Sequence, residues 1–396
     1  MKTNESAEKK QTTQASEKKA TPKKNTALTG AVTGENVHFQ QTAQKTLDKG
    51  VADITKAAKT YSNNDPASQA GFVAEADHIA TFNIRKVLGR SKIRAEKTPN
   101  GTHGDYKIVK GKKILVEGEI KYHGTAEKTE NAMRGYDGQQ RVGPADQSEE
   151  IIEIAKRKAM KNQTTRPDVS KEHGEVASNA GDCITDGKTK STPRTSKEVK
   201  GQAKKASKGD VSHKDILPPF GESVKIAAKS GAKTGGLIGG GIGLVTSGAS
   251  NTKAYRNGEK SGEEAMIDTA KETAVATVDG AVKGAVGSVA SVGGKQLASR
   301  ITNRLGKKIL GGSGPAVVAI GAIEIGKHAV NLSRGKIDEN EFSEKSATTV
   351  MTSGGAWAGA VAGAFALSWL GPVGTTIGAI GGGIAGTMGM EAALSA

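Results

Sequence analysis

The chain has few of the residues that build a large hydrophobic core. Of its 396 residues only 3% are aromatic and 35% are hydrophobic, whereas 53 are glycine. Its single cysteine, Cys183, excludes an intrachain disulfide and a cysteine-based zinc site. The polar residues 1–24 lack the apolar stretch of a secretory signal. We therefore expect a protein that is made in the cytosol and is exported, if at all, by a route that reads no such signal.

Basic side chains outnumber acidic ones. There are 57 lysines and arginines against 41 aspartates and glutamates, which gives a formal net charge of +16 and a pI of about 9.6. A positive surface favours anionic partners, namely nucleic acid or an acidic membrane surface. The same composition is typical of a solvated, lysine-rich linker. The charge alone does not choose between these interpretations.

Composition divides the chain into four regions. The polar, low-complexity segment 1–64 predicts a largely disordered N-terminus, with a weak helix over 37–60. The segment 163–215 has almost no large apolar side chains and predicts a disordered basic linker. Between them, residues 65–162 have the patterns of an ordered α/β module, and residues 216–396 predict helices. The expected fold class is therefore α+β, with a small mixed α/β module, a linker and an all-α C-terminal region.

The module over 65–162 opens with a helix. Asp65 and Pro66 are the residue types of a helix start, and Gly89 marks its end. Two strands follow, Tyr106–Val109 and Ile114–Tyr122, and the glycine between them predicts a hairpin turn at 110–112. A short strand over 139–142 and a helix over 148–160 complete the module.

Two neighbouring strands of this module carry carboxylates and a lysine. Asp105 opens the first strand, and Glu119 and Lys121 lie on the next. Alternation places Glu117, Glu119 and Lys121 on one face, and a hairpin would bring Asp105 towards Glu119. Two converging carboxylates suit Mg²⁺, and a lysine beside them could activate water and offset charge on a phosphoryl group. The alternative is that these residues form the solvated face of an amphipathic strand.

This layout resembles the PD-(D/E)xK nuclease superfamily, whose motif is an Asp followed by (Asp/Glu)-x-Lys on the next strand. The resemblance covers residues 65–162 and implies a mixed sheet flanked by helices and Mg²⁺-dependent hydrolysis of phosphodiester bonds. It implies that Asp105 and Glu119 bind the metal and that Lys121 is catalytic. It also implies an acidic residue from the preceding helix, here Glu75, and a polar residue on the following element, here Gln140. The sequence departs from the motif before Asp105, where glycine replaces the proline.

The C-terminal region repeats glycine at every fourth position. Ladders begin at Gly231, Gly355 and Gly374, and no ionisable side chain occurs between Lys345 and Glu391. Helical residues four apart share a face, so each ladder is a strip along which helices can approach closely. The region resembles the glycine-zipper segments of bacterial toxin-like and membrane-lesion proteins. Its length and lack of charge predict a transmembrane hairpin over 348–394; a soluble hairpin packed through its glycines is the alternative.

Two functions are compatible with these features. The first is a nuclease-like effector or defence protein, in which an Mg²⁺-dependent head is tethered to a membrane by the glycine-rich tail. The alternative is a non-enzymatic, membrane-associated or membrane-permeabilising protein whose α/β head is a binding module. The expected partners are nucleic acid, a lipid bilayer and further copies of the chain, bound through the glycine ladders.

Overall fold

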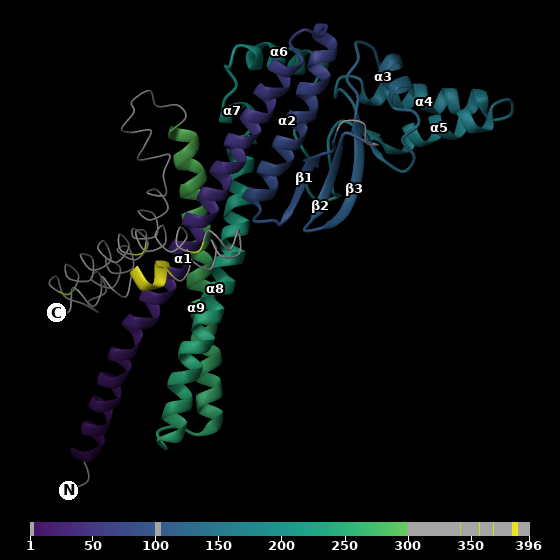
Figure 1. Ribbon diagram of the computed structural model, residues 1–396. Coiled ribbons are helices and arrows are strands. Elements are labelled where there is room, and N and C mark those ends of the chain that lie inside the picture. The colour runs from purple at the N-terminus through teal and green to yellow at the C-terminus, as the bar shows by residue number, and fades with distance from the viewer. Residues whose placement is uncertain are drawn as a thin grey trace. The chain divides into compact units, whose positions relative to one another are not determined.

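The computed structural model describes residues 4–99 and 104–298, together with Glu341, Ala356, Leu367 and residues 382–386. The described chain contains both helices and a five-stranded sheet, which confirms the α+β class (Figure 1). It divides into two compact units. One is Thr42–Ser223, and the other combines Met1–Gln41 with Val224–Ala396. Each unit has its own packing and is described separately below.

The unit Thr42–Ser223 is built around a sheet with the strand order β1-β2-β3-β4-β5. The first three strands form an antiparallel meander, and the last two add in parallel. The hairpin predicted between the second and third strands is present, with Gly111 at the left-handed φ of 63° that its turn requires. The strand bounds are β1 (Ile93–Lys97), β2 (Tyr106–Lys110), β3 (Lys113–Ile120), β4 (Gln140–Val142) and β5 (Ala180–Gly181).

Helices flank this sheet and make its parallel connections. The helix predicted from Asp65 is α2 (Pro66–Leu88), and the Asp65 carboxylate accepts a hydrogen bond from the Ser68 amide at 3.1 Å. It packs against β1 and α6. Parallel strands need crossover connections, and here helices provide them between β3 and β4 and between β4 and β5. The remaining helices are α3 (Ala126–Ala132), α4 (Ser148–Asn162), α5 (Pro167–Asn179), α6 (Ser196–Ser207) and α7 (His213–Ile216).

The prediction of a disordered linker over 163–215 is wrong. This segment contains α5, β5, α6 and most of α7. Its few apolar side chains are isolated in sequence, but Val176, Ile184 and Val199 are each fully buried. Asp186 also forms a buried ion pair with Lys86 of α2, with 2.5 Å between the charged atoms. The average composition of the segment does not indicate these buried residues, because each of them is a single apolar residue among polar ones.

The prediction of a largely disordered N-terminus over 1–64 is also wrong, because α1 (Asn4–Thr60) covers most of it. Propensity alone does not hold a polar helix of this length together, and packing of its apolar side chains must stabilise it. Within the unit Thr42–Ser223, Leu47 and Ile54 are buried. Within the other unit, Leu28 and Val32 form a buried cluster against Ile238 and Ile242 of the helix α8 (Phe220–Arg256).

In the second unit, α8 (Phe220–Arg256) and α9 (Gly262–Ala298) run antiparallel with their backbones in close contact (Figure 1). The first glycine ladder forms this interface. A methyl group at Gly231 or Gly235 would lie 2.2 or 2.0 Å from a carbonyl oxygen of α9. Larger residues would force the helices apart. The α1 segment of this unit also contacts α9, where the buried ammonium of Lys283 donates to the Thr29 hydroxyl at 3.0 Å.

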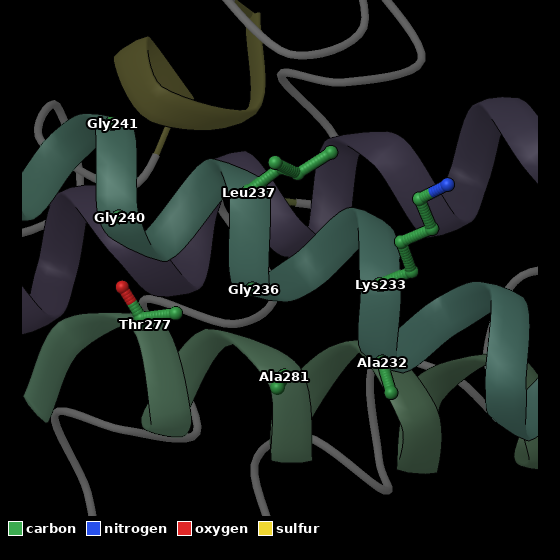
Figure 2. A pocket seen from close by; sticks show the side chains of 8 residues that line it. All are labelled: Ala232, Lys233, Gly236, Leu237, Gly240, Gly241, Thr277 and Ala281. Carbon is green, nitrogen blue, oxygen red and sulfur yellow. The ribbon is translucent and has the colours of Figure 1, made fainter. Parts of the chain in front are cut away.

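A shallow groove of about 500 Å³ follows this contact between α8 and α9. Small residues form its floor, and Figure 2 shows Thr277 and Ala281 of α9 below it. The side chains of Lys233 and Leu237 point away from α9. Leu237 is 70% exposed. The groove is therefore bordered by apolar surface that the described residues leave uncovered.

The transmembrane hairpin predicted over 348–394 lies almost entirely outside the described residues. Of the helices that are described, none combines the length and the hydropathy needed to cross a bilayer. The described residues of this segment include Gly383, where an added methyl group would lie 2.4 Å from the Gly30 carbonyl oxygen of α1. A second close glycine contact therefore occurs in this unit.

Candidate active site

Three strand ends meet at one edge of the sheet and position the predicted site. Asp105 directly precedes β2, and its amide donates to the Gly118 carbonyl of β3 at 2.9 Å. Lys121 directly follows β3, and its amide donates to the Val142 carbonyl of β4 at 2.9 Å. The β2–β3 register pairs Tyr106 with Gly118. The residues on either side of this pair, Asp105 and Glu119, are therefore brought to the same place.

The side chains of Asp105, Glu119 and Lys121 converge there. The Lys121 ammonium donates to Glu119 Oε1 and lies 3.7 Å from Asp105 Oδ2. The same Asp105 oxygen accepts a hydrogen bond from the Ile120 amide at 2.9 Å, which fixes the carboxylate. Glu119 is only 3% exposed, whereas Glu117 is exposed. A solvated strand face accounts for Glu117 but not for the burial of Glu119.

Glu75 of α2 belongs to the same electrostatic environment. Its carboxylate is buried, and Oε2 accepts a hydrogen bond from Lys97 Nζ at 2.7 Å. Burial, followed by the negative charge of Asp105, raises the pKa of Glu75 to about 7, although Lys97 and Lys121 act in the opposite direction. Glu75 therefore binds its proton more tightly than an exposed glutamate does.

Lys97 is a further residue of this cluster, and no motif in the sequence points to it. It is the last residue of β1, and the β1–β2 register pairs it with Tyr106, next to Asp105. A strand assignment for 93–97 with the correct register would have placed it there. The structure thus adds a second lysine to the carboxylate cluster, with its side chain 43% exposed.

The structure does not bring Gln140 to this cluster. Its amide oxygen accepts hydrogen bonds from the Tyr106 hydroxyl at 2.5 Å and from the Thr185 amide at 2.9 Å. Gln140 pairs with Gly118, and successive strand residues point to opposite faces, so Gln140 faces away from Glu119. Gln139, which precedes Gln140 in the sequence, is the residue that lies beside Gly104. A methyl group added at Gly104 would lie 2.9 Å from Gln139 Oε1. That oxygen is buried and has no hydrogen-bond partner in the structure as described.

A loop between α3 and β4 carries an aromatic side chain to the cluster. The Lys121 ammonium lies 5.3 Å from the centre of the Tyr136 ring. The flanking Gly135 and Gly138 have φ values of 83° and 69°, which favour glycine. Arg141 of β4 is fully buried beneath the loop. It donates to the carbonyl oxygens of Met133 and Tyr136, both at 2.7 Å, and so secures both ends of the turn.

The carboxylates fit a hard divalent cation. Asp105 and Glu119 place oxygen ligands around one positive charge, here the Lys121 ammonium, and Mg²⁺ is commonly held by one or two carboxylates with retained waters. The raised pKa of Glu75 reports burial and a nearby negative charge, which a cation would offset. Across the ranges that the structure describes, no group of three or more His, Cys, Asp or Glu residues is arranged as a metal cage.

Fold and site together define a mixed α/β unit with a charged cluster at one edge of its sheet. No family model matches the chain, and no curated protein or solved structure matches it either.

Proposed function

We propose that the unit Thr42–Ser223 is an Mg²⁺-dependent nuclease of the PD-(D/E)xK kind that hydrolyses phosphodiester bonds. The observation that carries this proposal is the convergence of Asp105, Glu119 and Lys121 at one edge of the sheet. The flanking helices and the mixed sheet agree with the fold that the resemblance implies. Ionisable groups whose pKa values are shifted by burial and by neighbouring charges, as that of Glu75 is, are concentrated at catalytic sites.

Asp105 and Glu119 would hold the metal, and the bound Mg²⁺ would polarise a phosphoryl oxygen and lower the pKa of water. Lys121 has its ammonium between the two carboxylates and 23% of its side chain exposed, so it is accessible to a phosphate group. We assign it the roles of orienting the attacking water and offsetting the charge that develops on the phosphoryl group. Glu75 keeps Lys97 in place, and Lys97 offers a second positive charge to the substrate.

The test is cleavage of plasmid DNA and of labelled RNA by the full chain, with and without Mg²⁺. The matched pair of variants is Lys121→Ala and Lys113→Ala, because Lys113 is an exposed lysine at the opposite end of β3. We expect cleavage by the wild type and by Lys113→Ala, a loss of at least about 100-fold in Lys121→Ala, and none in the presence of EDTA. A wild type that is inert with Mg²⁺, Mn²⁺ and Ca²⁺ on both substrates would overturn the proposal.

Membrane association is a second candidate function, supported by the surface of α8 and α9. These helices expose large apolar side chains, among them Leu237, Val245 and Met266 at 70%, 71% and 76%. These side chains lie on two helices that pack against each other, and large exposed apolar surfaces mark protein or membrane interaction sites. We therefore retain a bilayer as a partner and the membrane as the place of action. The first glycine ladder is occupied by α9, so self-association is a proposal for the two later ladders.

Flotation of the full chain with vesicles of anionic phospholipid tests this second function. We expect the wild type to float and the triple variant Leu237→Glu, Val245→Glu, Met266→Glu to float less. Met160→Glu is the matched control, because Met160 is 75% exposed but belongs to the other unit. Equal flotation of all three proteins would exclude this surface, and recovery of the wild type only in the unbound fraction would exclude membrane binding.

A further inference from the structure

Each lysine of the site lies beside an aromatic ring. The Lys121 ammonium is 5.3 Å from the Tyr136 ring centre, and the Lys97 ammonium is 5.8 Å from that of Phe72. Phe72 in turn stacks on Tyr61, with 3.5 Å between the ring centres and 11° between the planes. Positive charges that follow a phosphate backbone, combined with aromatic faces for bases, are how proteins bind single-stranded nucleic acid.

Of these rings, Tyr136 is the one beside Lys121, the proposed catalytic lysine. It contacts the ammonium that also touches Glu119 and lies near Asp105. A phosphate bound at Lys121 would place one of its own neighbouring bases within reach of this ring. The Tyr136 side chain is half-buried, so part of it is accessible.

The loop that carries Tyr136 is held from below by Arg141. Besides its bonds to the loop, this guanidinium donates to the Glu175 carbonyl at 3.0 Å and lies 3.2 Å from the Glu175 carboxylate. A fully buried arginine is costly unless its donors are satisfied, and here they fix the backbone on which Tyr136 stands. A ring held in this way loses less conformational freedom when a ligand binds it.

We propose that Tyr136 is the stacking platform for the nucleobase next to the scissile phosphate, and that the strand bound there is single. A duplex keeps both faces of its bases stacked on their neighbours, so only a single or locally opened strand can offer a base face to the ring. The proposal rests on the proposed nuclease function, because it uses Lys121 as the phosphate contact. It adds a substrate preference and a residue that the resemblance does not include.

The test is equilibrium binding of oligonucleotides to the full chain in EDTA, where cleavage is prevented. The probes are a single strand with one 2-aminopurine, whose fluorescence is quenched by stacking, and the matched duplex. Tyr136→Ala should weaken single-strand binding about ten-fold or more and relieve the quenching, because stacking of a base on an aromatic side chain is a main source of affinity for single strands. Tyr136→Phe should keep both affinity and quenching. Tyr255→Ala, which removes a 55% exposed tyrosine of the other unit, should change neither.

The outcomes separate this inference from the nuclease proposal. If Tyr136→Ala binds the single strand like the wild type, or weakens single strand and duplex equally, the stacking role is overturned while cleavage by the wild type stands. If the wild type binds and stacks the single strand but cleaves nothing, the nuclease proposal fails and the stacking role is supported. Tyr136→Leu keeps the bulk of the ring without its π face, so it repeats the test if the alanine variant does not fold.

Discussion

Lys97 of β1 holds the buried carboxylate of Glu75 at 2.7 Å, and β2 lies between β1 and the strand that Lys121 follows. The Glu75 side chain is mostly buried and the Lys97 side chain is 43% exposed, so the ion pair extends from the protein interior to the solvent. Lys97 thereby compensates in part for the burial of a charge that α2 contributes to the site. Because that compensation is incomplete, the pair has a measurable effect on stability.

We predict that Glu75→Gln stabilises the protein at pH 8 but not at pH 4.5. The pKa of Glu75 is raised by burial from 4.5 to about 7, so the folded state holds more protons than the unfolded state between these values. The contribution of Glu75 to the free energy of unfolding therefore falls as the pH rises from about 4.5 to about 7, and it is constant above that range. The gain at pH 8 should be on the order of 2 kcal/mol. Urea unfolding at the two pH values measures it, and equal gains at both would contradict the prediction.

We predict the opposite pH dependence for His78. This fully buried imidazole lies 2.8 Å from both the Ser191 and the Tyr122 hydroxyls. Burial lowers its pKa from 6.5 to about 4, so the unfolded state binds the extra proton between these values, and stability is lost as the pH falls through this window. His78→Gln should be less stable at pH 7 and should show a flatter profile from pH 6.5 to 4.

Since the windows of His78 and Glu75 overlap and their signs are opposite, the wild-type profile alone does not separate them. The difference between the variant and wild-type unfolding curves does. A His78→Gln profile parallel to that of the wild type would contradict the assignment to His78.

Gly118→Ala should destabilise the sheet severely. The new methyl group would lie 2.3 Å from Cζ and the hydroxyl oxygen of Tyr106, which is fully buried and has no room to move away. We expect a loss of about 3 kcal/mol in the free energy of unfolding. Gly124→Ala is the control, because nothing lies within 4 Å of its added methyl group. Thermal unfolding of the two variants compares them directly, and similar melting temperatures would refute this packing.

Gly235→Ala should separate α8 from α9, because its methyl group would lie 2.0 Å from the Gly280 carbonyl oxygen. Gly241→Ala should stabilise the same helix by up to about 1 kcal/mol, because nothing lies within 4 Å of the added methyl group and alanine is the better helix former. Helix loss on heating, followed by far-ultraviolet circular dichroism, should therefore shift in opposite directions. A shift in the same direction would show that the two backbones are not in contact.

The sequence predicted the parts of the site that depend on local pattern. Asp105, Glu119 and Lys121 could be brought together because a hairpin and strict alternation are readable from neighbouring residues. To place Lys97 and Gln139 near these residues, one must know the register of β1 against β2 and that of β4 against β3. No local sequence pattern specifies these registers. Gln140 is one position away from Gln139, which lies beside Gly104, and in a strand a shift of one position reverses the face.

The folded segment 163–215 was missed for a related reason. Val176, Ile184 and Val199 are single apolar residues in polar surroundings, and each becomes an anchor only because a distant part of the unit covers it. The same holds for the long N-terminal helix. A low average hydropathy therefore did not indicate disorder in either segment, since burial was concentrated in a few positions.

Arg141 also sets a lower limit on the length of chain that can carry the site. Its guanidinium reaches Glu175 of α5, and β4, on which it stands, pairs with β5. A fragment that ends at residue 162, where the α/β module was expected to stop, would lack both α5 and β5. The Arg141 guanidinium would then lose the Glu175 carboxylate, its ion-pair partner among the described residues. Any shortened version of this protein intended to keep the Asp105–Glu119–Lys121 cluster and the helix α2 beside it must therefore extend through α6, whose Gln202 donates to the buried Asp77 carboxylate of α2.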